Sequence, residues 1–256
     1  MGLDSPRTYG GGMEIQWLNA VIDIPADHFG EASDFWTELT ATTLGEVHPD
    51  HDEFVHLIPR AGDGYLELQR IEQGPAAAHL DLVVDDIPAW RDRAVAAGAT
   101  VVAEPGHVVL HTPGGVPFCI VPYTDEAAPV PVIDPKRPHA ADQICLDVPH
   151  DHFEADIAFW AELTGWAVNE PTFPEFRSFA QPEHLPLRIL IQQLGPEDTG
   201  GGRAHLDVSS GEHVAELTKT HVEHGADVVE VGTYWTALRD PAGMPYCLTS
   251  RPPTVG

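Results

Sequence analysis

Hydrophobic and polar positions alternate with two different periods along the first part of the chain. Residues 15–24 (IQWLNAVIDI) are rich in β-branched and aromatic side chains and end at Pro25, which is typical of a strand. Residues 29–39 then carry apolar side chains every three or four positions, which predicts a helix with one apolar stripe. Two short apolar runs follow at 54–58 and 65–71, joined by a glycine-containing turn. This pattern predicts the order β-α-β-β.

The same order of elements returns further along the chain. A strand at 79–84 precedes a helix that begins near Pro88 and ends at Gly98. Asp86 is the expected cap of this helix, as Asp27 is of the earlier one. Further strands are expected at 101–102, 107–111 and 118–121. With a short extra strand in the first unit, this half of the chain is interpreted as two β-α-β-β-β modules.

The second half of the chain repeats the first. DIPADHFGEASDFWTELT at 23–40 matches DVPHDHFEADIAFWAELT at 147–164, an offset of 147 − 23 = 124 residues. In this second copy, Glu154 is placed to complete a capping box. The repeat predicts four modules in two tandem domains. We expect a disordered leader at 1–12, a first domain at 13–125, a proline-rich linker at 126–139 and a second domain at 140–251.

Charge and cysteine content limit the partners of the protein. Asp and Glu total 40 against 13 for Lys and Arg, a formal net charge of −27 over 256 residues. Such a chain is repelled by phosphate backbones and anionic membranes, so neither nucleic acid nor membrane is an expected partner. Its three cysteines are odd in number and widely spaced, which favours free thiols in the cytoplasm. The expected partner is a small organic ligand, and the protein is expected to be a monomer or homodimer.

A His-Leu-Asp motif occurs once in each half. It places His79 beside Asp81 and His205 beside Asp207. On a strand, residues i and i+2 point to the same face, so each motif presents a titratable pair. One interpretation is a general base oriented by a carboxylate. The other is a strand histidine in a local polar network.

The histidine motif, the helices ending in GAT and GAD, and the stretches TPGGVPFCIV at 112–121 and DPAGMPYCLT at 240–249 together resemble the vicinal oxygen chelate superfamily. The resemblance is to its glyoxalase-like domains and covers both halves. It implies an α+β fold of two tandem domains, each made of paired βαβββ modules that curl round a cleft. Relatives include lactoylglutathione lyases, extradiol dioxygenases and metal-free binders such as bleomycin-resistance proteins.

The resemblance also implies where a metal would be held. In the first domain the family positions fall on Asn19, Glu67, His79 and Cys119. In the second domain they fall on Gln143, Leu190, His205 and Cys247, where only the histidine matches the usual ligand set. A divalent ion (Zn, Fe, Mn or Ni) in the first domain, held by Glu67, His79 and Cys119, is therefore one expectation. The alternative is that no metal is bound and Cys119 is a small buried residue.

The remaining candidates are ligand contacts. Trp17 and Trp235 are candidates for the wall of a ligand site, since an aromatic ring offers a large contact area with one polar edge. Gln69 and Gln192 are expected to supply amide contacts. Asn19, Gln143 and Cys247 complete the candidate ligand-binding residues. The sequence favours a small-molecule-binding protein, with sequestration of a metabolite or drug as one form, and a metal-dependent lyase, isomerase or dioxygenase as the alternative.

Overall fold

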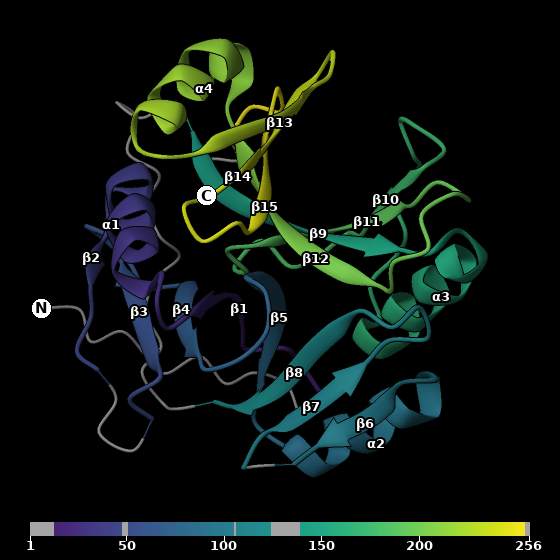
Figure 1. The fold of residues 1–256 in the computed structure, drawn as a ribbon. Helices are drawn as coiled ribbons and strands as arrows, with labels where there is room; N and C mark the ends of the chain where they lie inside the picture. The colour runs from purple at the N-terminus through teal and green to yellow at the C-terminus, as the bar shows by residue number, and fades with distance from the viewer. Residues whose placement is uncertain (1–12, 48–50, 105, 124–138, 254–256) are drawn as a thin grey trace, which may run out of the picture.

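The computed structural model describes residues 13–47, 51–104, 106–123 and 139–253 (Figure 1). The leader expected at 1–12 and, apart from His139, the linker expected at 126–139 lie outside these residues. No helix within the described ranges has the length and apolar character needed to cross a membrane.

The first domain contains two modules. Their elements are β1 (Trp17–Pro25), α1 (Phe29–Thr40), β2 (Thr43–Leu44), β3 (Phe54–Ile58) and β4 (Leu66–Ile71), then β5 (Ala77–Val84), α2 (Ile87–Ala97), β6 (Thr100–Ala103), β7 (Val108–His111) and β8 (Pro117–Pro122). The expected β-α-β-β-β order and the α+β class are confirmed.

The second domain repeats this order with a shorter third module. Its elements are β9 (Ala140–Val148), the 3-10 helix η1 (His150–His152), α3 (Phe153–Thr164), β10 (Phe176–Ser178) and β11 (Arg188–Gln193), then β12 (Arg203–Ser209), the 3-10 helix η2 (Gly211–His213), α4 (Val214–Glu223), β13 (Asp227–Val231), β14 (Trp235–Arg239) and β15 (Pro245–Thr249). A single bridge between Val168 and Phe179 stands where the missing strand of the third module would lie.

All described strands belong to one 15-stranded sheet. In each module the first strand pairs in parallel with the last, as β1 does with β4 and β5 with β8. The two modules of a domain meet through their antiparallel first strands, β1 with β5 and β9 with β12. The two domains join where Ala78 of β5 pairs with Ala204 of β12.

The helix starts differ in part from expectation. Asp86 caps α2 as expected, because its carboxylate accepts from the Ala89 amide at 3.0 Å. Asp27 does not cap α1, whose N-cap is His28 without a side-chain hydrogen bond. Glu154 forms no capping box either, since η1 leads directly into α3. The preceding 3-10 turn brings backbone groups to the helix start, so a side-chain cap is not needed there.

Each domain's first helix packs against a strand of the other domain. The rings of Phe35 and Trp36 on α1 lie 6.0 and 5.3 Å from Tyr246 of β15. Reciprocally, Phe159 and Trp160 on α3 lie 5.7 and 5.3 Å from Phe118 of β8. Helix α3 also lies beside α2 (Figure 1). The two domains therefore share their cores, and each supplies apolar surface that the other needs.

Each of these junctions contains a buried carboxylate that accepts hydrogen bonds. In one junction it comes from the hairpin turn, and in the other from the helix. At the α1 junction, Asp240 in the β14–β15 turn accepts from the Trp36 indole at 2.9 Å and from the amides of Ala242 and Met244. The β7–β8 turn has Thr112 at the corresponding position, 240 − 128 = 112.

The α3 junction takes its carboxylate from the helix instead. Asp156 accepts from the Thr112 hydroxyl and the Gly114 amide, both at 2.6 Å. Its counterpart on α1 is Ala32, 156 − 124 = 32. Buried polar groups need partners. The buried groups of each turn therefore bind one carboxylate, which belongs to the turn itself in one junction and to the helix in the other. The indole N–H of Trp160 has no partner here, in contrast to that of Trp36.

We predict that Asp156→Ala lowers the free energy of unfolding by roughly 2–3 kcal/mol, because it leaves the Thr112 hydroxyl and the Gly114 amide without their acceptor. Adding Thr112→Asp rebuilds the arrangement around Asp240 and should recover part of the loss. Urea unfolding of the three proteins measures the effect. A double variant less stable than Asp156→Ala alone would contradict the equivalence of the two junctions.

His221 lies on α4 and is buried at the α1 junction. It is only 1% exposed, and its Nδ1 lies 2.8 Å from the Tyr246 hydroxyl. Burial, with the positive charges of His139 and His224, lowers the pKa of His221 from 6.5 to about 3. The folded protein therefore keeps this ring neutral, while the unfolded chain protonates it below pH 6.5.

Stability should therefore fall as the pH drops from 6.5 towards 3, by up to about 1.4 kcal/mol per pH unit from this group. We predict that His221→Gln, which keeps a polar partner for Tyr246, makes this pH dependence shallower. Urea unfolding at several pH values measures the slope, with the exposed His150→Gln as control. Equal slopes in all three proteins would show that His221 has the same pKa in the folded and unfolded protein.

Candidate functional site

Strand alternation divides the sheet of each domain into two faces. The apolar face carries fully buried side chains such as Leu18, Ile22 and Leu80. The opposite face, here called the polar face, carries in domain 1 the polar side chains of Asn19, Asp23, Glu67, Gln69, His79, Asp81 and Cys119. This face is also mostly buried, with Glu67 8% and Asp81 6% exposed.

His79 lies at the centre of the polar face of domain 1. Its Nδ1 is 2.9 Å from Asp23 Oδ2, and its Nε2 is 3.4 Å from Asp81 Oδ1. The short contact therefore runs to the neighbouring strand, while the partner two residues along is more distant, as the strand spacing requires. Cys119 pairs in register with Asp81. The ligand atoms of His79, Asp81 and Cys119 all lie within 4.8 Å of one another.

Burial shifts the charge states of this group. Burial disfavours the His79 cation, but hydrogen bonds with Asp23 and Cys119 and the charge of Asp81 outweigh it, so the pKa of His79 is well above its usual value. Burial raises the pKa of Cys119 to about 11. At neutral pH the face therefore holds an imidazolium between two aspartates, beside a protonated thiol.

Glu67 lies apart from the group of three donors. Its Oε1 is 3.3 Å from Nε2 of His56 on the adjacent strand β3. Burial raises the pKa of Glu67 to about 8, and the charge of Asp81 adds to the shift. The structure thus groups Asp81, rather than Glu67, with His79 and Cys119.

Domain 2 repeats the histidine arrangement. Nδ1 of His205 is 3.1 Å from Asp147 Oδ2, and its Nε2 is 3.4 Å from Asp207 Oδ1. Two groups of possible metal donors share this histidine, one with Asp207 and Cys247 and one with Asp147 and Cys145. Burial opposes protonation of His205, but the charges of Cys145 and Asp147 outweigh it and raise its pKa well above the usual value.

The neighbours of His205 differ from those of His79. Gln143 donates to Asp207, and the Cys145 thiol lies 3.5 Å from Gln192 Oε1. Leu190 pairs with Cys145 as Glu67 pairs with Val21, so an aliphatic side chain occupies the place of the glutamate. Both domains therefore offer three grouped donors, but domain 2 lacks the carboxyl group that domain 1 has at this strand position.

The two tryptophans lie at the ends of the polar faces. Trp17 starts β1, and its indole donates to the Gly64 carbonyl at 3.1 Å. Trp235 starts β14 and packs so closely on Gly232 that an added Cβ there would lie 2.6 Å from the indole. Both rings are half-buried. Gln69 is half-buried and pairs with Asp23.

Aromatic rings connect the two edges of the domain 2 sheet. Phe173, just before β10, lies 6.1 Å from Tyr234 in the β13–β14 turn and 6.5 Å from Phe176. These strands are at opposite edges of the sheet of this domain. Phe176 pairs with Gln192 in the row of Asp147, so the contact forms on the polar-face side. The sheet of domain 2 therefore curls until its edges meet.

Sequence reasoning missed the strongest partners of both histidines. Asp23 and Asp147 lie on the first strand of each domain, far in sequence from the histidines. Two signals pointed to them. They are the first residues of the 124-residue repeat, and they stand four positions after Asn19 and Gln143 on the same strand, hence on the same face.

Buried oxygen atoms without partners gather on the polar faces. Within the described residues, Oδ1 of Asn19, Asp23, Asp81 and Asp147 is buried and accepts no hydrogen bond. Buried polar atoms are normally satisfied by protein, water, an ion or a ligand. These oxygens therefore mark a face on which a further donor or a cation would be stabilised.

The residues of domain 1 fit a divalent ion of the kind that the resemblance implies. The donors around an ion bound at about 2.0–2.3 Å lie about 3–4 Å apart. Those of His79, Asp81 and Cys119 lie within 4.8 Å of one another, so a small inward movement would bring them to this spacing. Asp23 accepts from Nδ1 of His79, which leaves Nε2 to ligate, as in many carboxylate–histidine–metal arrangements. Uptake would displace the protons of His79 and Cys119 and would weaken at low pH.

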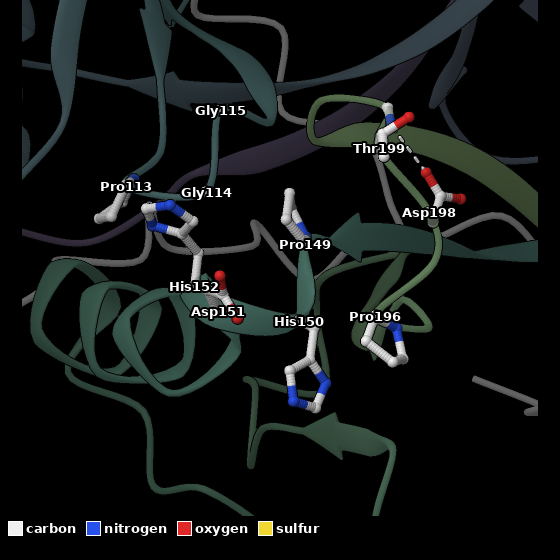
Figure 2. Close-up of a pocket in the computed structure, with 11 residues that line it drawn as sticks. Pro113, Gly114, Gly115, Pro149, His150, Asp151, His152, Pro196, Asp198 and Thr199 are labelled. Atoms are coloured by element: carbon white, nitrogen blue, oxygen red, sulfur yellow. Dashed lines mark hydrogen bonds between the residues drawn. The ribbon is translucent and has the colours of Figure 1, made fainter.

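A separate open pocket of about 420 Å³ lies between the domains (Figure 2). It is lined by the turn at Pro113–Gly115, by η1 and by the loop around Asp198. No residue expected from the sequence to be in the site lines it, and its side chains from η1 are exposed. The grouped titratable residues of the polar faces therefore remain the candidate site.

Solved structures with similar folds include a Mn(II)-bound glyoxalase and a dioxygenase. The Mn(II)-bound glyoxalase from Novosphingobium aromaticivorans aligns with a TM-score of 0.57 and 16% identity, over 94% of this chain and 84% of that one. The 2,2',3-trihydroxybiphenyl 1,2-dioxygenase from Sphingomonas wittichii strain RW1 aligns with a TM-score of 0.61 and 14% identity, over 95% and 92%. At such identities the likeness shows the fold alone.

The sequence comparisons agree with this fold. No curated protein matches the chain in sequence. The family model for the glyoxalase-like domain matches residues 19–121 and 143–249, one segment in each half of the repeat. The matched segments contain both histidine motifs and the strands that carry the polar faces. The chain therefore belongs to the glyoxalase-like domain family of the vicinal oxygen chelate superfamily.

Proposed function

We propose that this protein binds a small organic ligand on the polar face of one or both domains, where the Nε2–H groups of His79 and His205 donate to a ligand oxygen. The observation that supports this most is the set of buried carboxylate and amide oxygens around these histidines that accept no hydrogen bond, although Asp81 Oδ1 has an ion-pair contact with His79. Asp23 and Asp147 hold the rings in place from the neighbouring strand. Such a site recognises a hydroxyl group, which can accept from Nε2–H and donate to these oxygens.

The three free cysteines suit a reducing cytoplasm, where sequestration of a metabolite or drug would take place. The two tandem domains provide in one chain the pair of units that a homodimer would supply.

A second candidate function is a metal-dependent lyase, isomerase or dioxygenase. Two observations favour it: the grouping of His79, Asp81 and Cys119, and the metal-dependent glyoxalase among the structural neighbours. A bound divalent ion would polarise a substrate oxygen and stabilise the charge that develops on it. The protein's own part would be to orient His79 through Asp23 and to exclude water by burial.

Metal content separates the two candidates. We expect less than about a tenth of an equivalent of Zn, Fe, Mn or Ni after gentle purification from cells grown with all four, since a site of three or four ligands retains zinc. Elemental mass spectrometry measures it. Near one equivalent of metal, lost in Cys119→Ser and in Asp81→Asn, would favour the enzyme.

Ligand-observed NMR with a mixture of small polar compounds tests binding itself, and binding weakened by His79→Gln or His205→Gln is the expected result.

The carboxylate partners give a prediction that needs no ligand. In metal-free protein, Asp23→Asn should lower the pKa of His79, because it removes the negative charge at Nδ1, and should leave His205 unchanged. Asp147→Asn should do the converse. Imidazole ¹⁵N chemical shifts against pH measure both. If each histidine titrates as in the wild type, the cross-strand pairs do not hold the rings in the protonated state.

A further inference from the structure

The polar face of domain 2 carries two arginines at positions where that of domain 1 has a tyrosine and an alanine. Arg188 pairs with Gln143. The matching position in domain 1 is Tyr65, directly before β4, which stands two residues before Glu67 as Arg188 stands two before Leu190. Arg203 pairs with Asp147, whereas Ala77 pairs with Asp23.

The difference at the position of Glu67 also makes the polar face of domain 2 less negative than that of domain 1. Leu190 removes a carboxyl group that domain 1 has at Glu67. No Lys or Arg occurs among the polar-face residues described above for domain 1. Matched positions therefore give domain 2 two more cations and one fewer acid, on a chain whose overall charge is −27.

The two arginines of domain 2 differ in how they are neutralised. Arg203 lies 3.4 Å from Asp147 and 2.7 Å from Asp198, so two carboxylates already compensate its charge. Arg188 is half-buried and, within the described part of the chain, donates no hydrogen bond and forms no ion pair. Burial, with the charge of Arg251, lowers its pKa.

The carboxylates nearest to Arg188 are engaged elsewhere. Asp142 and Asp207 both act on its charge. However, both oxygens of Asp142 contact the guanidinium of Arg251. Asp207 accepts from Gln143 and lies 3.4 Å from His205. A partly desolvated guanidinium without a partner is costly, and a bound anion would compensate it.

Arg188 also lies in the correct place to act with the histidine. It belongs to the row that runs through Gln143, Asp207 and Cys247 across β11, β9, β12 and β15. The next row contains Cys145 and His205. One ligand on this face can therefore meet the Arg188 guanidinium and the His205 ring together.

We propose that the polar face of domain 2 binds its ligand through an oxyanion group, a carboxylate or a phosphate, held by the guanidinium of Arg188 beside His205. This rests on the proposed small-molecule function and names the ligand class for domain 2. The planar fork of Arg188 matches two oxygens of either group. Domain 1, with Tyr65 and Glu67 at the matched positions, is not built for such a ligand.

The test uses the full chain and three probes: succinate, its neutral diamide succinamide, and inorganic phosphate. Isothermal titration calorimetry should show binding of succinate or phosphate, and weaker or no binding of the diamide. Arg188→Gln should weaken oxyanion binding about tenfold or more, as expected for loss of a charged hydrogen-bonding partner. Arg188→Lys, which keeps the charge without the fork, should fall between. Arg70→Gln, which removes an exposed arginine from domain 1, should bind as the wild type does.

Each outcome decides between the two proposals. Binding of succinate alone assigns a carboxylate ligand, and binding of phosphate alone assigns a phosphate ester. Equal affinity in wild type and Arg188→Gln, or a diamide that binds as tightly as succinate, overturns the oxyanion assignment. Neutral compounds whose binding depends on His205 but not on Arg188 keep the small-molecule function and overturn only this inference. If charged and neutral compounds alike fail to bind, the proposed function itself is wrong.

Discussion

A buried carboxylate holds the two domains together at each junction between a helix of one domain and a hairpin turn of the other. Asp240 and Asp156 fill this role on opposite sides, and each satisfies amides that would otherwise be buried without partners. With the helices fixed in this way, one face of the sheet is fully covered by apolar packing. The other face is left to carry polar groups, and every candidate site residue with a titratable side chain lies there.

The polar face is unusual because it is both charged and mostly buried. Burying a charge is costly unless it is paired, and the pairing of His79 and His205 with aspartates on both sides answers this cost. The arrangement is repeated in both domains, although the residues around it have diverged. The repeated histidine–aspartate pairs are suited to holding an imidazole in a fixed orientation. The diverged residues around them determine which ligand groups can contact it.

Much of the architecture could be predicted from the sequence, because strand and helix periods and the 124-residue repeat are local signals. The placement of His79 beside Asp81 follows from strand alternation alone. Its closer partner Asp23 depends on the register between β1 and β5, which no local pattern fixes. The same limit applies to Glu67, which the sequence places among the expected metal donors. Its contact with His56 depends on the register between β3 and β4. The packing of each domain's first helix against the other domain gives no periodic signal in the sequence.

The two junctions also limit how the halves of this chain can be interchanged. A protein made of two copies of the first half would place Ala32 opposite Thr112 at both junctions, with no carboxylate at either. Two copies of the second half would bring Asp156 and Asp240 together at both, two buried acids competing for the same amides. The halves have thus become complementary parts of one folding unit, and neither can replace the other although they descend from the same pattern.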